Sequence, residues 1–247
     1  MMKRIVCIVF PAAALFFCAC EGFDFALNAI TVRGSGNVIS EKRDVRGFKQ
    51  VELAGSGELT ISQGDTESLT VEADDNIMPR IRTEVHGDRL RIGLEQGVSV
   101  RPTAPMRYTL VVRDLTGVEL SGSGKILAGA LRCSDLTLDI SGSGSIRFDQ
   151  LAAGNVRAEI DGSGNMRIAG KANRQDVQIS GSGSYQAEDL ESRSAKVSID
   201  GSGDSTLWVR DSLSTSISGS GSVHYYGNPS LSKSASGSGH VRSLGER

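Results

Sequence analysis

Serines have the most regular arrangement of the potentially reactive residues in this chain, because nine of them stand in the tripeptide Gly-Ser-Gly. A nucleophilic serine needs a base beside it, and a phosphate-binding loop needs Lys-Ser or Lys-Thr directly after its glycines. No copy of the tripeptide is followed by that pair, and nine equivalent serines cannot all serve one reaction. The motif therefore indicates a structural role.

The other reactive side chains are too scattered along the chain to form a recognisable site. His86, His224 and His240 lack the spacing of zinc ligands. The two Asp-Gly-Ser-Gly segments, at 161 and 200, lack the nine-residue period of calcium-binding repeats. Cys133 has no histidine near it in the sequence. We expect no catalytic residue, no metal and no cofactor, and we predict that the protein is not an enzyme.

Apolar residues flank the tripeptide at a period of two, which predicts β-strands rather than a flexible linker. The residue two places before the first glycine is apolar in every copy: Val32, Leu53, Leu120, Ile140, Ile160, Ile179, Ile199, Ile217 and Ala235. Four places after it, apolar residues dominate: Val38, Leu59, Ile126, Ile146, Met166, Tyr185, Ser205, Val223 and Val241. Each copy therefore predicts two strands that meet at a corner.

The spacing of the copies predicts how these corners stack. From Gly122 onward the steps between copies are 20, 20, 19, 20, 18 and 18 residues, and a fixed period of this length is typical of a solenoid. We predict an all-β fold, a right-handed parallel β-helix-like solenoid with coils of about 20 residues. Either both glycines face inward, or one adopts a positive φ in a tight turn. In both cases the tripeptide is a corner that repeats once per coil. If both glycines face inward, we expect the serines to form an outward column, but the sequence alone leaves open whether they point in or out.

The N-terminal half is predicted to be β-rich but less regular, because the tripeptide is missing between Gly55 and Gly122. Strand patterns cover 69–73, 81–85, 89–94 and 108–112, with a hairpin turn at Gly87-Asp88. The sequence leaves open whether 58–121 continues the solenoid or forms a separate sheet. We therefore divide the domain into an N-terminal part, 30–121, and a regular solenoid, 122–245.

The first residues are typical of a secretory signal, with Lys3 and Arg4 before an apolar run from Ile5 to Ala19. Ala19-Cys20 resembles the processing site of a bacterial lipoprotein. We predict a signal peptide over 1–19, lipidation of Cys20 and a tether over 20–29. The alternative is an ordinary cleaved signal. The anchor predicts that the protein is secreted across the inner membrane and becomes an outer-membrane lipoprotein, on the cell surface or on the periplasmic face.

Charge argues against one class of partner. The chain has 27 basic and 29 acidic residues and a formal net charge of −2, with the two signs interspersed. No basic patch stands out, so we expect no nucleic acid to bind.

A family resemblance rests on two groups of residues. The segments 46–53 and 55–64, Arg-Gly-Phe-Lys-Gln-Val-Glu-Leu and then Gly-Ser-Gly-Glu-Leu-Thr-Ile-Ser-Gln-Gly, resemble the start of the DUF2807 family. The later Leu-Thr-Leu-Asp-Ile-Ser-Gly-Ser-Gly repeats are similar to that family's C-terminal half. The resemblance covers 30–245 and implies an auto-transporter adhesin, head GIN domain, with a β-helix-like fold behind a lipoprotein signal. It implies no catalytic residues.

These observations predict a lipid-anchored, non-catalytic module of the cell envelope, adhesin-like or a scaffold, that binds a protein or glycan partner and is able to form a homo-oligomer. Trp208, Tyr225 and Tyr226 are the candidate contacts, because exposed aromatic residues often mark interaction sites. The alternative function is a polysaccharide-cleaving β-helix enzyme, which would need paired carboxylates on an outward face.

Overall fold

The computed structural model describes residues 30–247. The predicted signal peptide, tether and Cys20 lie outside the described residues. Apart from one 3₁₀ turn, η1 (Met78–Arg80), every regular element of the described part is a strand. The all-β class is confirmed. None of the helical structure in residues 30–247 is long and apolar enough to cross a membrane.

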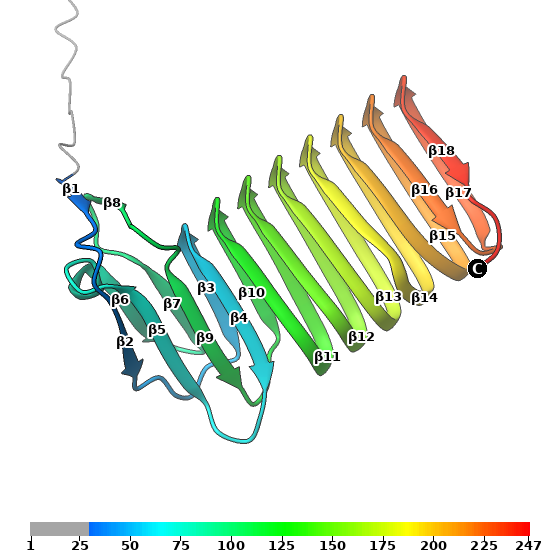
Figure 1. Cartoon of the computed structure of the whole chain (residues 1–247). Coiled ribbons are helices and arrows are strands. Elements are labelled where there is room, and N and C mark those ends of the chain that lie inside the picture. Colours follow the sequence, from blue (N-terminus) through cyan, green and yellow to red (C-terminus); the bar gives the residue numbers. More distant parts are fainter. Residues whose placement is uncertain (1–29) are drawn as a thin grey trace, which may run out of the picture.

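A stack of parallel coils forms the C-terminal half (Figure 1). It contains β10 (Gly117–Gly122), β11 (Lys125–Gly142), β12 (Ser145–Gly162), β13 (Asn165–Gly181), β14 (Ser184–Gly201) and β15 (Asp204–Gly219), and it ends with β16 (Ser222–Tyr226), β17 (Ser230–Gly237) and β18 (His240–Ser243). Equivalent residues of successive coils pair directly, as Ile140 does with Ile160 and Gly142 with Gly162. The solenoid with coils of about 20 residues is confirmed.

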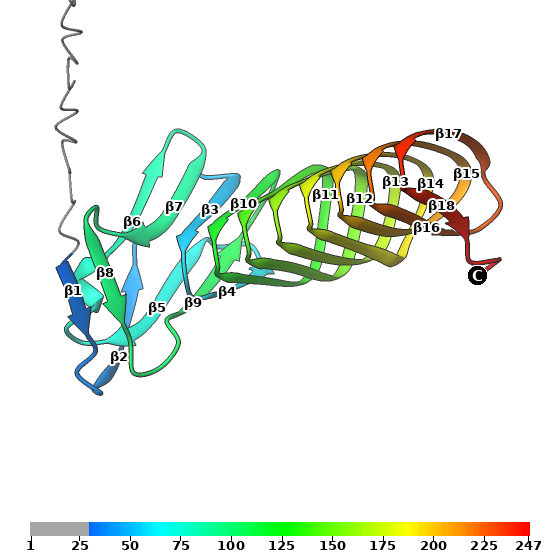
Figure 2. The same cartoon turned by 90° about the horizontal axis from the view of Figure 1, so that it is seen from above.

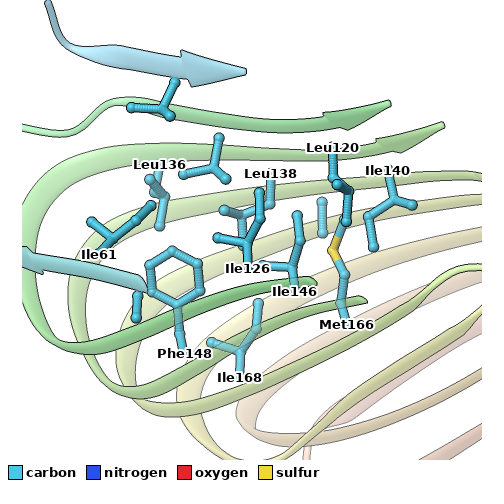
Figure 3. Close-up of a cluster of buried hydrophobic side chains, with 14 of the residues drawn as sticks. Ile61, Leu120, Ile126, Leu136, Leu138, Ile140, Ile146, Phe148, Met166 and Ile168 are labelled. Atoms are coloured by element: carbon cyan, nitrogen blue, oxygen red, sulfur yellow. The ribbon is translucent and has the colours of Figure 1, made fainter. Parts of the chain in front are cut away.

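The predicted apolar positions form columns of buried side chains inside the coils. Ile140, Ile160 and Ile179 succeed one another in one column and are at most 2% exposed. Figure 3 shows Leu120, Ile140 and Phe148 among the side chains that fill the interior. Full burial of a side chain of this size stabilises a fold by about 1.5–3 kcal/mol. The columns are therefore the main source of stability, and each coil buries its apolar residues only against its neighbours.

The two glycines of each corner have different roles. In the stacked copies the first glycine has φ between +107° and +128°, a region that L-residues avoid. A Cβ on Gly162 would lie 2.7 Å from the carbonyl oxygen of Gly142. The second glycine faces inward, where a Cβ on Gly203 would lie 2.6 Å from Cγ2 of Ile179. From Gly122 onward, the first glycine of each corner therefore has the positive φ and the second faces inward without one, whereas at the corner of Gly55 the second glycine, Gly57, also has a positive φ of +121°.

The serine between them faces outward, and its backbone rather than its hydroxyl connects the coils. All nine serines are exposed. The N–H of Ser143 donates to the carbonyl oxygen of Gly122 at 3.0 Å, and that of Ser163 donates to Gly142 at 2.9 Å. The corner thus keeps the parallel ladder bonded through the bend, and the serine column is a by-product of that bonding.

The N-terminal half continues the stack and then closes it (Figure 2). Its strands are β1 (Ile30–Arg33), β2 (Val38–Arg43), β3 (Gln50–Gly55), β4 (Glu58–Gln63), β5 (Ser68–Asp74), β6 (Ile81–His86), β7 (Arg89–Leu94), β8 (Val98–Arg101) and β9 (Arg107–Val112). β3 and β4 lie parallel to β10 and β11, and β7 and β9 add a further parallel layer beneath them. β6 and β5 then pair antiparallel with β7 and β9, while β2 pairs with β5.

This arrangement settles the open question about 58–121. The segment extends the solenoid by one layer and also supplies the antiparallel strands that end it. The predicted strands over 69–73, 81–85, 89–94 and 108–112 are confirmed as β5, β6, β7 and β9. The hairpin at Gly87-Asp88 is confirmed too, with Gly87 at φ +62°.

The first Gly-Ser-Gly departs from the predicted pattern. Gly34, Ser35 and Gly36 lie in the loop between β1 and β2 and not at a corner of the stack. Its flanking apolar residues Ile30 and Val38 are 64% and 48% exposed. Val32, by contrast, is partly buried and packs against the core. The prediction of buried flanks is therefore wrong for Ile30 and Val38, because β1 and β2 pair with β8 and β5 and are not stacked between coils.

Candidate functional site

An aromatic pair lies on the outside of the last coils. Trp208 of β15 pairs in register with Tyr226 of β16, and both side chains are partly exposed. Trp208 stands between Leu207 and Val209, which are both fully buried, so the alternation of the strand directs its ring outward. The parallel register therefore places the two aromatic residues on adjacent strands, whose backbones lie about 4.8 Å apart.

Tyr225 occupies a different face. It pairs with Leu207, an inward residue, and packs against the core. Its side chain is partly buried and continues an interior column rather than the outer aromatic pair. Of the three aromatic residues identified in the sequence, Trp208 and Tyr226 therefore lie on the outer face of the sheet and Tyr225 lies on its inner face.

Arg247 joins the aromatic pair from the end of the chain. Its guanidinium carbon lies 5.6 Å from the centroid of the Trp208 ring and 5.4 Å from that of Tyr226, within the range of cation–π interactions. It also donates hydrogen bonds to the carbonyl oxygen of Glu188 and to the carboxylate of Asp189. We call Trp208, Tyr226, Arg247 and Asp189 the aromatic surface. The sequence pattern gives no signal for Arg247, because the residue lies beyond the last strand.

The segment that carries Arg247 is bonded to the last coil. The N–H of Leu244 donates to the carbonyl oxygen of Tyr225 at 2.8 Å, and the N–H of Gly227 donates to that of Gly245 at 2.9 Å. These bonds continue the ladder beyond β16 and β18, and they direct the chain end toward the two rings.

A series of buried hydrogen bonds between polar side chains ends at the backbone of Trp208. The Tyr185 hydroxyl donates to Oε1 of Gln175 at 2.8 Å, and Nε2 of Gln175 donates to the Ser192 hydroxyl at 2.8 Å. The Ser192 hydroxyl in turn donates to the carbonyl oxygen of Trp208 at 3.0 Å. Tyr185, Gln175 and Ser192 are at most 1% exposed, so each polar group is satisfied within the interior. The Trp208 backbone is held in place from inside the coil.

A column of carboxylates lies on the outward face of the first coils. Glu52, Glu119, Asp139 and Glu159 are successive partners in the parallel register of β3, β10, β11 and β12. Partial burial raises the pKa of Asp139, and the neighbouring charges of Glu159 and Glu119 raise it further. This is the arrangement of paired acids that a polysaccharide-cleaving enzyme would require.

Arginines engage most of that column. Arg89 contacts Glu119 at 2.5 Å, Arg91 contacts Glu52 at 3.0 Å and Arg157 contacts Glu159 at 3.6 Å. The cavity beside Glu119 and Asp139 has a volume of about 190 Å³, smaller than the roughly 300–1,000 Å³ of ligand pockets. Three of the four carboxylates in the column are therefore paired with arginines, and the hollow beside the column is small.

Two larger hollows adjoin the loops of the N-terminal half. They have volumes of about 820 and 840 Å³ and share Asp65 and Arg113. The first is lined by four basic and three acidic residues and the second by three basic and two acidic residues, so each contains charges of both signs. Neither hollow is lined by charged residues of a single sign.

The remaining reactive residues are dispersed. The His86 side chain contacts the Glu84 carboxylate at 3.1 Å. His224 lies opposite Arg242, and His240 lies opposite Ser222, in the parallel register of β16 and β18. Within residues 30–247 no group of three or more His, Cys, Asp or Glu side chains is placed to hold a metal ion. Burial raises the pKa of the Cys133 thiol, and the Asp135 charge adds to the effect.

A clamp of polar residues holds the first Gly-Ser-Gly. The buried Asp74 carboxylate accepts hydrogen bonds from the Thr103 hydroxyl at 2.6 Å and from the N–H of Gly36 at 2.9 Å. The Ser35 hydroxyl donates to Asp75 at 2.5 Å, and its N–H donates to the side chain of Asn76 at 3.0 Å. The clamp attaches the N-terminal loop to the end of the stack.

The clamp also sets the ionisation of its two acids. Hydrogen bonds from Thr103 hold the pKa of Asp74 below its ordinary value, and hydrogen bonds from Ser35 and Asn37 do the same for the pKa of Asp75. These side chains therefore stabilise the fold when they are ionised.

The stacked in-register coils, the glycine corners and the antiparallel N-terminal strands define a parallel β-solenoid. The chain belongs to the DUF2807 family, described as "Putative auto-transporter adhesin, head GIN domain", which matches residues 47–229. The family resemblance predicted from the sequence is confirmed. No curated protein matches the chain.

Solved structures share this fold. A crystal structure described as a "putative adhesin" from Bacteroides fragilis NCTC 9343 is 24% identical, with a TM-score of 0.81, and the match covers 86% of this chain and 100% of that one. A "putative lipid binding protein" from Parabacteroides distasonis ATCC 8503 is also 24% identical, with a TM-score of 0.75 and coverage of 87% and 100%. A "putative adhesin" from Parabacteroides merdae ATCC 43184 is 20% identical, with a TM-score of 0.66 and coverage of 87% and 99%.

The clamp predicts a specific loss of stability in acid. Because the folded-state pKa values of Asp74 and Asp75 lie below their unfolded values, their stabilisation is complete above the ordinary aspartate pKa of about 4. It is lost as the pH falls through the folded-state values. Asp75→Asn should reduce the free energy of unfolding at pH 7 and flatten its decline below pH 4, as measured by urea unfolding. Asp161→Asn, at an exposed corner position, is the control, and equal acid profiles for the two variants would contradict the clamp.

Proposed function

We propose that the protein is a lipid-anchored, non-catalytic, adhesin-like module of the cell envelope, and that the aromatic surface binds a glycan or an envelope protein. The observation that carries the proposal is the alignment of Trp208 and Tyr226 in one outward column with Arg247 against both rings. The family's description as an adhesin supports the same class of function.

The chemistry of the aromatic surface fits a sugar. Aromatic rings with a polar edge provide apolar contact area together with hydrogen bonding, which suits the C–H face and hydroxyl groups of a pyranose ring. The Arg247 guanidinium lies against both rings and is hydrogen-bonded to the Asp189 carboxylate, so a donor and an acceptor belong to the same surface. Since Arg247 already covers part of both rings, a ligand would use their remaining exposed area or displace that side chain.

The rigid coil supports a binding role better than a catalytic one. Coils joined by short corners present a fixed surface, and the series of buried hydrogen bonds that ends at Trp208 holds its backbone in one position. Cleavage of a polysaccharide would have to use the carboxylate column, where arginines contact three of the four acids.

Binding can be measured directly because Trp208 is the single tryptophan of the chain. A glycan that binds the protein on an array, or a purified envelope protein that binds it, should change the Trp208 fluorescence when it is titrated into the protein. Tyr226→Ala should weaken binding by at least about five-fold, the loss of about 1 kcal/mol typical of a contact at a binding hot spot.

Leu231→Ala is the matched control, since Leu231 is an exposed apolar residue on the neighbouring strand β17. It should leave the affinity unchanged. A partner that binds wild type and Tyr226→Ala equally, without affecting Trp208, would place the binding site elsewhere and refute the aromatic surface.

The proposed anchor rests on the Ala19-Cys20 segment and the apolar run before it. A labelled fatty acid fed to the producing cells should be incorporated into the wild-type chain and not into Cys20→Ser, and the variant should leave the membrane fraction. Two acyl chains are needed for stable anchoring. Equal membrane retention of both chains, with no label in either, would rule out lipidation at Cys20.

A further inference from the structure

No strand within residues 30–247 pairs with the outer edge of the coil formed by β17 and β18. Among residues 30–247, β17 pairs only with β15, and β18 pairs only with β16. All eight residues of β17 are exposed, including Leu231, Lys233 and Ala235, which continue columns that are buried in β15. The outer edges of these strands therefore carry backbone groups that an additional strand could bond.

Lys233 interrupts one interior column at this end. The column runs Val177, Val197, Thr215 and Lys233 in direct register from β13 to β17. Val177, Val197 and Thr215 are at most 3% exposed, whereas Lys233 is exposed. A charged side chain thus stands at a position that any further layer of the stack would bury.

The neighbouring columns remain suited to stacking. Leu231 pairs with the buried Leu213, Ala235 pairs with the buried Ile217, and Val241 packs against the core. Leu231 is 38% exposed. The end therefore retains apolar side chains at the spacing of a coil, together with an unpaired strand edge, and Lys233 lies between Leu231 and Ala235.

We infer that Lys233 prevents this end from stacking against a second copy of the same chain, a partner that its apolar columns and unpaired strand edge would otherwise fit. The end is one layer of a stack whose columns repeat with this chain's own coil geometry, so another such coil is the partner that matches it in spacing. Two ends that meet around a two-fold axis pair β17 antiparallel with β17. Each copy then buries an unpaired ammonium group in a shared interior, close to the same charge from its partner.

The other end of the molecule limits the size of the assembly. There the stack is closed by the antiparallel strands β2, β5 and β6, which do not reproduce the columns of the coils. Within residues 30–247, only the end formed by β17 and β18 therefore continues the columns of the coils. Removal of the charge should yield a dimer and not a filament.

The experiment compares secreted chains that all carry Cys20→Ser, so that no acyl group drives association. Sedimentation equilibrium of this background should show a monomer, whereas added Lys233→Val should produce a dimer that associates about 100-fold more tightly. Lys196→Val is the matched control, because it removes the same charge from an exposed outward position of β14 and should stay monomeric. Leu231→Asp, added to Lys233→Val, should restore the monomer.

Each other result decides against the inference. A Lys233→Val chain that remains monomeric would show that the end does not fit a second copy. A dimeric background chain would show that Lys233 does not hold the copies apart. Filaments, or equal association of Lys196→Val and Lys233→Val, would show association through another surface. Because Lys233 is exposed, thermal unfolding should confirm that the substituted chains are folded.

Discussion

The corner of each coil is the constraint on which the rest of the structure depends. The first glycine adopts a φ near +120°, and its α-carbon passes so close to the coil below that a Cβ on Gly181 would lie 2.6 Å from the carbonyl oxygen of Gly162. No other residue type satisfies both conditions. Because every coil bends at the same place, the strands between corners stay parallel and in register.

Register then determines what each surface can do. Side chains at equivalent positions stand one strand apart, so an outward position becomes a column of like residues. At the first coils this arrangement aligns Glu119, Asp139 and Glu159, whose mutual repulsion is offset by arginines on the same face. At the last coils it aligns Trp208 with Tyr226. The two surfaces differ in chemistry although they share one backbone geometry.

Periodicity made the fold predictable, and long-range pairing limited the prediction. The alternation around Ile140 and Ile160 identified the interior columns, because the same residue types recur at the same place in each coil. It could not reveal that Leu53 pairs with Leu120 across the inserted strands β5 to β9. Trp208 was found by alternation, whereas Arg247 reaches the site from beyond the last strand. The first Gly-Ser-Gly matched the pattern and yet lies in a loop, because Asp74 and Asp75 bind it.

The free energy of unfolding of Gly162→Ala tests the central claim most directly, with Ser163→Ala beside it as the control. The alanine at 162 must adopt φ near +116° and accommodate a Cβ 2.7 Å from the Gly142 carbonyl oxygen. Denaturant unfolding should therefore show a loss of at least about 1–3 kcal/mol for Gly162→Ala. The exposed Ser163→Ala should stay within about 0.5 kcal/mol of wild type. Equal stability of the two variants would contradict the account, because the corner would then tolerate a side chain.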